Sequence, residues 1–174
     1  MDVDIEYEFD LEPEITIDYR ISKQILEWLK ENMENITDSN DKKLFSKVNY
    51  GYTEDTIKGF GKKPVCDVYI NNITYDSDLH VNVPSSVTSF IICYLKGNMN
   101  NAYLKACELT DYLIQEFNDN ESFRRLTLTN VIDQETVITN IVRDTFIRNV
   151  ELQVIPGSKT YGVLCAFELE HELY

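Results

Sequence analysis

The segment from Val87 to Leu95 (VTSFIICYL) limits the fold more than any other part of the chain, because it is almost entirely apolar. No apolar stretch of the chain reaches the length of a membrane span. The β-branched and aromatic residues of Val87 to Leu95 favour a strand. A strand that is apolar at consecutive positions is buried on both faces of its sheet. We therefore expect a central strand, with burial of the side chains of Phe90, Ile91, Ile92 and Tyr94.

The beginning of the chain alternates strictly between two kinds of residue. Every even position from Asp2 to Glu14 carries an acid, and apolar residues stand between the acids at Val3, Ile5, Tyr7, Phe9 and Leu11. Successive side chains of an extended strand point to opposite faces, so this arm has one anionic face and one apolar face. The apolar face needs a partner surface, which is either its own domain or a neighbouring subunit whose sheet edge it extends. We expect residues 2–11 to dock between subunits.

Length and charge indicate one domain with an appendage. The 174 residues divide into the arm at 1–19 and a single α+β domain at 20–174. The net charge is −14, of which residues 1–20 contribute half, with eight acids against Arg20. So acidic a chain is a poor candidate for nucleic-acid binding driven by phosphate neutralisation.

Residues 42–63 have the opposite charge and contain three glycines, which predicts a mobile loop in which a short strand could form around Val48. Tyrosine is suited to interfaces, because it offers a large area and a hydrogen bond at small entropic cost. The candidate interface residues of this segment are Lys42, Lys43, Lys47, Tyr50, Tyr52, Lys58, Lys62 and Lys63.

Two amphipathic helices are predicted from apolar residues at three- to four-residue steps. The stripe of the first helix, near 20–36, is Ile21, Ile25, Trp28, Leu29, Met33 and Ile36. The stripe of the second helix, near 101–117, is Ala102, Ala106, Leu109, Leu113 and Phe117. Asp18 or Ser22 is expected to cap the first helix, and Asn100 the second.

The remaining elements are predicted strands, which cover 65–70, 126–128, 137–142, 145–155 and 160–173, with a brief continuation at Val81 and Val83. Pro156 to Lys159 reads as a hairpin turn between the last two strands. The predicted fold class is α+β. A small, mostly antiparallel sheet carries two main helices, and the extended acidic arm precedes them.

Residues that could carry catalysis are few. The four cysteines are widely spaced and read as small apolar residues of a reducing compartment. Strand alternation places Glu168, Glu170 and Glu172 on the face opposite His171, so they do not converge with it. The stretch 76–78 (Asp-Ser-Asp) lacks the glycine and final glutamate of a calcium loop. We therefore assign no catalytic, cofactor or metal residue and expect a protein that is not an enzyme.

The order of the elements resembles that of the tail terminator (tail completion) proteins of long-tailed bacteriophages and phage-derived contractile particles. An amphipathic helix is followed by a glycine–lysine segment that ends in Pro64, then by the apolar strand, a helix introduced by an Asn-rich turn, and a terminal hairpin. Ala106, Leu109 and Leu113 match the A-x-x-L-x-x-x-L pattern of the family's second helix. The acidic arm is a departure, because members usually begin near the first helix.

The resemblance implies a structural function in the virion, assembled in the cytoplasm of the bacterial host. Such proteins form rings, typically of six subunits, that cap the tail tube, stop its polymerisation and offer a surface to the head connector. The implied partners are copies of the chain itself, the tube and possibly sheath proteins, and the head-connector protein, with neither nucleic-acid sequence recognition nor a membrane. Two alternatives remain open at this stage: a neck or head-completion protein, and a monomeric cytosolic binding module.

Overall fold

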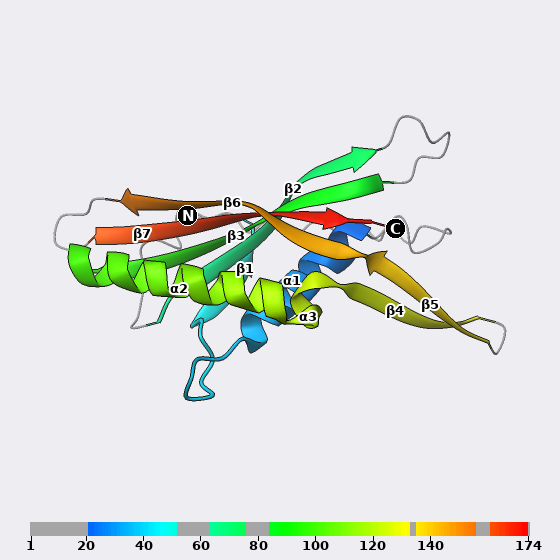
Figure 1. Ribbon diagram of the computed structural model, residues 1–174, viewed down its shortest axis with the longest axis horizontal. Helices are drawn as coiled ribbons and strands as arrows, with labels where there is room; N and C mark the ends of the chain where they lie inside the picture. Colours follow the sequence, from blue (N-terminus) through cyan, green and yellow to red (C-terminus); the bar gives the residue numbers. More distant parts are fainter. Residues whose placement is uncertain (1–20, 52–62, 76–83, 133–134, 156–160, 174) are drawn as a thin grey trace, which may run out of the picture.

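The computed structural model describes residues 21–51, 63–75, 84–132, 135–155 and 161–173 (Figure 1). Its elements are α1 (Ile21–Asn35), β1 (Lys47–Tyr50), β2 (Val65–Tyr75), β3 (Pro84–Gly97), α2 (Met99–Asp119), α3 (Glu121–Arg124), β4 (Leu126–Ile132), β5 (Glu135–Val142), β6 (Asp144–Ile155) and β7 (Tyr161–Glu172). Five strands form one sheet in the order β1-β2-β3-β7-β6. All its pairs are antiparallel except β1–β2, which confirms the predicted α+β class.

Strand β3 lies at the centre of the sheet, as the apolar segment predicted. Ile91, Ile92 and Tyr94 are buried, whereas Phe90 is half-buried. Ile91 and Ile92 are consecutive, so their side chains lie on opposite faces of the sheet. Both faces of the sheet are therefore covered at β3.

The two long helices pack on one face of the sheet (Figure 1). Their predicted stripes are confirmed: Ile25 and Leu29 of α1 and Ala106 and Leu113 of α2 have no exposed surface. They belong to one core cluster that contains sheet residues such as Phe167. This cluster occupies the space between the helical layer and the sheet.

The helix caps differ from the prediction. The Asn98 side chain accepts a hydrogen bond from the backbone N–H of Asn101 at 2.9 Å, so Asn98 is the N-cap and α2 begins at Met99. Asn100 lies inside the helix. Both residues stand in the same Asn-rich turn, and the sequence alone does not distinguish them. Ser22 lies in the first turn of α1, and Asp18 is outside the described residues.

Within the predicted loop at 42–63, residues 47–50 form the short strand that was expected around Val48; this strand, β1, pairs in parallel with 65–68 of β2. Phe45 and Val48 are buried there and belong to the main core cluster, which holds this segment on the sheet edge. Residues 52–62 lie outside the described part of the chain.

The segment that follows α3 does not join the main sheet. Strands β4 and β5 are longer than the predicted strands and pair with each other as a separate two-stranded ribbon. Figure 1 shows this ribbon projecting beyond the five-stranded sheet. The predicted turn at 156–159 and the strand continuation at Val81 and Val83 lie outside the described residues.

Candidate functional site

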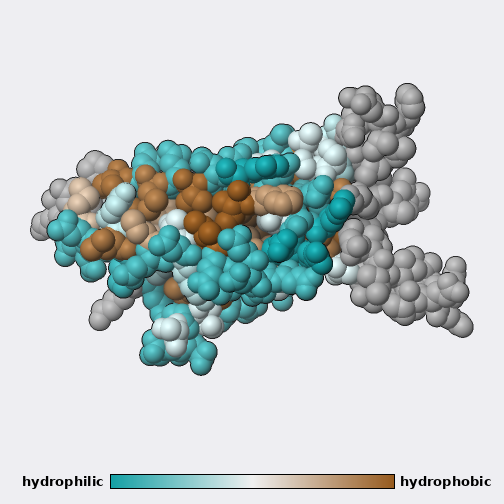
Figure 2. Space-filling view, in the orientation of Figure 1, coloured by the Kyte–Doolittle hydropathy of each residue, from teal (hydrophilic) through white to brown (hydrophobic). Residues whose placement is uncertain are grey.

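A band of hydrophobic surface runs between α2 and the edge strand β6 (Figure 2). Its residues are half-buried: Ile114 of α2 and Ile147, Val150, Leu152 and Val154 of β6. All of them except Val154 pack against the main core cluster. We call this set the β6–α2 band. Among the described residues β6 pairs with β7 alone, so the outer backbone edge of β6 adjoins the band. An apolar surface beside an open strand edge is a typical protein contact surface.

The band ends in a hollow of about 420 Å³ at the start of β6. Apolar residues line it on both sides, including Ile114 and Phe117 of α2 and Phe146 and Ile147 of β6. Phe146 is 42% exposed, although phenylalanine is usually buried. Arg124 borders the same hollow, and its charge is paired with the carboxylate of Asp144.

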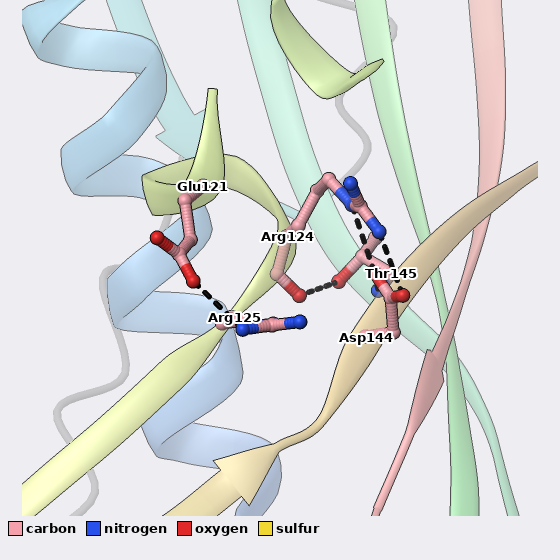
Figure 3. A network of polar contacts seen from close by, with 5 residues as sticks. All are labelled: Glu121, Arg124, Arg125, Asp144 and Thr145. Atoms are coloured by element: carbon pink, nitrogen blue, oxygen red, sulfur yellow. Dashed lines mark hydrogen bonds and ion pairs between the residues drawn. The ribbon is translucent and has the colours of Figure 1, made fainter. Parts of the chain in front are cut away.

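An ion pair fixes the junction where the ribbon joins β6 (Figure 3). The Arg124 guanidinium donates two hydrogen bonds to the Asp144 carboxylate, from Nε to Oδ1 at 3.0 Å and from Nη2 to Oδ2 at 2.8 Å. The Arg124 side chain, together with the Thr145 backbone amide, holds the pKa of the Asp144 carboxyl below its ordinary value of 3.8. Bidentate geometry restricts both side chains, so the pair links the end of α3, just before the ribbon, to the start of β6, just after it.

A chain of hydrogen bonds continues from this junction into the core. The Thr145 hydroxyl donates to the Arg124 carbonyl at 3.1 Å, and its oxygen lies 2.9 Å from Nδ1 of His171. Since the one hydroxyl proton is used, Nδ1 must carry a hydrogen and donate to Thr145. The other ring nitrogen, Nε2, then accepts from the Ser89 hydroxyl at 2.6 Å. This assignment requires a neutral ring, and burial lowers the pKa of His171 to about 3, which keeps the ring neutral near pH 7.

The Ser89–His171 pair resembles the first two members of a catalytic triad, but its surroundings do not. Both residues have no exposed surface, and the Trp28 and His171 rings form a T-shaped pair with ring centroids 5.7 Å apart. Ser89 donates its proton into the core, and no substrate can reach its oxygen in this arrangement. The hydrogen bonds that run from Arg124 to Ser89 thus join α3, β6, β7 and β3 and do not form an exposed nucleophile.

The sequence-predicted lysines lie at the start of β1 and β2. Lys42, Lys43, Lys47 and Lys63 are all exposed, and we call these four residues the lysine cluster. The Lys63 ammonium donates to the Lys43 carbonyl. The cluster can attract an anionic partner, and the carboxylate of Asp38, whose pKa Lys63 and Lys42 help to lower, offsets one of its four charges.

A turn anchored by Asp38 holds one side of the lysine cluster. Its carboxylate accepts from the backbone amides of Lys42 at 3.0 Å and Asn40 at 2.9 Å, and these hydrogen bonds lower its pKa. Tyr50, another predicted interface residue, is 50% exposed, and the Lys30 ammonium lies 5.2 Å from its ring centroid. This cation–π contact presents the tyrosine ring at the surface.

The other predicted interface residues, namely Tyr52, Lys58, Lys62, Val3, Ile5, Tyr7, Phe9 and Leu11, lie outside the described residues. The β6–α2 band was not predicted as a site. Its signal in the sequence was the alternation of Val150, Leu152 and Val154, which reads equally as an ordinary packed face. Only the position of β6 at the sheet edge leaves that face half open.

A scan against protein-family models found no match, and a search of curated proteins found no similar sequence. None of the helices in the described ranges has the length and apolar run that a bilayer crossing requires. Within the same ranges, no three His, Cys, Asp or Glu side chains gather as a metal site would need. The four cysteines are free, and Cys66, Cys93 and Cys165 are buried as small core residues.

Proposed function

We propose that this chain is a structural subunit of a long-tailed phage or phage-like particle, where it forms a ring, typically a hexamer, on the tail tube. The ring terminates tube polymerisation and offers a surface to the head connector. The order of elements in the sequence supports this proposal, as does the α+β domain with two helices on one sheet face. The observation that carries it is the β6–α2 band beside the open edge of β6.

A ring needs two different surfaces on each subunit, because every copy contacts one neighbour on each side. The β6–α2 band with its strand edge supplies an apolar surface. The lysine cluster supplies a charged one at β1, the opposite edge of the sheet. Apolar area would contribute most of the affinity of such a contact, whereas the charges would mainly set its register and speed.

The ribbon of β4 and β5 supports an assembly function independently. An isolated two-stranded ribbon is marginally stable in water unless it packs on something else. In the sequence, residues 126–142 carry Asp133 and Glu135 as their charged residues and are rich in threonine, valine and isoleucine. At its base the ribbon packs on its own domain, where Ile141 and Val142 are buried in the main core cluster. We infer that the part of the ribbon beyond this base contacts another subunit or the tube.

Native mass spectrometry and light scattering of the purified chain test the ring. We expect the wild type to form a ring and Leu152→Lys to be monomeric, because the substitution places a charge in the band. Gln153→Lys is the matched control, since it adds the same charge at the adjacent exposed position and should leave the ring intact. If Leu152→Lys does not fold, Phe146→Arg provides the same test at a more exposed residue. A wild type that stays monomeric at high concentration contradicts the ring and supports the binding module.

Tube length tests the terminating function itself. The chain should be co-expressed with a candidate tube protein from the same genome, and the tubes measured by electron microscopy. We expect shorter, capped tubes with the wild type and long tubes with Leu152→Lys. Unchanged tube lengths together with binding to the head connector would instead indicate a neck or head-completion protein.

A further inference from the structure

The sheet face opposite the helices contains a second cluster of buried apolar residues. Ile92, Tyr94 and Leu164 are 4%, 1% and 7% exposed, and Tyr69, Phe90, Ile155 and Ala166 pack around them. We call this surface the second face. Val65 pairs with Tyr94 and Tyr94 with Leu164 across β2, β3 and β7, so the cluster crosses the middle of the sheet.

None of the described helices packs on the second face. The residues of α1, α2 and α3 that enter a core cluster all belong to the cluster on the other side of the sheet. A tyrosine side chain on an open sheet face would keep much of its ring in contact with water, yet Tyr94 is almost wholly buried. The second face is therefore covered within a single chain.

We propose that the N-terminal arm of the same chain covers the second face, with Val3, Ile5, Tyr7, Phe9 and Leu11 turned toward the sheet. These residues form an extended apolar surface that needs burial, and a sheet face with a stacked Tyr69–Phe90 pair suits such an arm. The segment 52–62 is less suited to cover this face, since its large apolar residues are limited to Tyr52, Ile57 and Phe60.

The length of chain before α1 allows this placement. Residues 12–20 join the arm to Ile21 and reach about 30 Å when extended. Five strands spaced about 4.8 Å apart span about 19 Å, so the connection is long enough to pass round a sheet edge. The arm thus returns to its own sheet, in contrast to the docking between subunits that the sequence alone suggested.

This placement gives the acidic row a function. With the apolar side chains turned inward, the carboxylates of Asp2, Asp4, Glu6, Glu8 and Asp10 form an anionic outer layer. This step rests on the proposed ring, in which the anionic layer is a complementary surface for the lysine cluster of a neighbouring copy. The apolar contact between the arm and the sheet lies within one subunit, and the acidic outer side of the arm contacts the neighbouring subunit.

Cysteine labelling in the full chain and in a chain lacking residues 2–12 tests the cover. Leu164→Cys reports on the second face, and Val163→Cys, the preceding residue on the helical side, is the matched control. Both are made with Cys107→Ser, and the labelled site is identified by peptide mass. We expect the deletion to speed labelling of Leu164→Cys at least tenfold and to leave Val163→Cys unchanged. Protection in the full chain should not depend on protein concentration.

Three results for the full chain and its deletion variant would overturn the proposal. They are an unchanged labelling rate at Leu164→Cys, an equal acceleration of labelling at both positions, and protection from labelling that increases with protein concentration. The last result would assign the cover to a neighbour's arm. The double substitution Ile57→Ser and Phe60→Ser removes two apolar side chains of 52–62 from the full chain. If this substitution speeds labelling of Leu164→Cys and the deletion does not, the cover is assigned to 52–62. Native mass spectrometry of the same samples reports the ring separately, so a monomer with a protected second face refutes the proposed function and not the arm.

Discussion

The buried His171 predicts a specific dependence of stability on pH. Its pKa is about 3 in the folded protein and 6.5 when exposed, so the unfolded chain binds one more proton between these values. Stability from the neutral histidine is complete above about pH 6.5 and is lost as the pH falls toward 3. At pH 5 the loss is about 2 kcal/mol relative to pH 7.5, on the way to a total of about 5 kcal/mol.

Urea unfolding at pH 7.5, 6.5, 5.5 and 5.0 measures this effect. With a slope near 2 kcal/mol per molar urea for a domain of this size, the midpoint should fall by about 1 M at pH 5. His171→Gln is the matched variant, because its amide can still hydrogen-bond but does not titrate. Subtracting its pH profile removes the contributions of the carboxylates and of His80, which both proteins share.

Parallel pH profiles for the two proteins would refute the buried, neutral histidine. If His171→Gln does not fold, the pKa of His171 can be measured in the wild type from the pH dependence of its ring proton resonances. A value near 6.5 would then contradict the arrangement with Thr145 and Ser89.

Three further predictions follow from the core, the ion pair and the lysine-rich segment. Ile91→Asp should prevent soluble folding, because burying each large apolar side chain contributes about 1.5–3 kcal/mol and the new charge has no partner; normal expression with cooperative melting would contradict this. Asp144→Asn should lower the urea midpoint at pH 7, and this loss should shrink as the pH falls, since the lowered pKa of Asp144 stabilises the fold only where the carboxyl is ionised. A loss that is the same at pH 7 and pH 4 would rule out the ion pair with Arg124 as the cause. Trypsin should cut first within 42–63 in the free subunit, and mass spectrometry of the fragments should show slower cutting in the ring; equal protection in both would exclude a contact function for the segment.

Local patterns in the sequence determined most of the elements of this protein. The spacing of Ile25, Leu29 and Met33 identified α1 and its buried side, and the apolar segment identified β3. Alternation also placed His171 opposite the glutamates, on the face that proves to be buried. These features are predictable because the period of apolar residues reports directly which side of a helix or strand avoids water.

The tertiary structure alone decided which elements meet. His171 is hydrogen-bonded to Ser89 and Thr145, which lie 82 and 26 residues away in the sequence. The parallel pairing of β1 with β2 and the separation of the β4–β5 ribbon from the sheet likewise carry no local signal. Alternating residues of β6 look the same whether the strand is central or at an edge, because strand order depends on contacts between distant segments. The β6–α2 band, and with it the candidate site, exists because β6 is the last strand of the sheet.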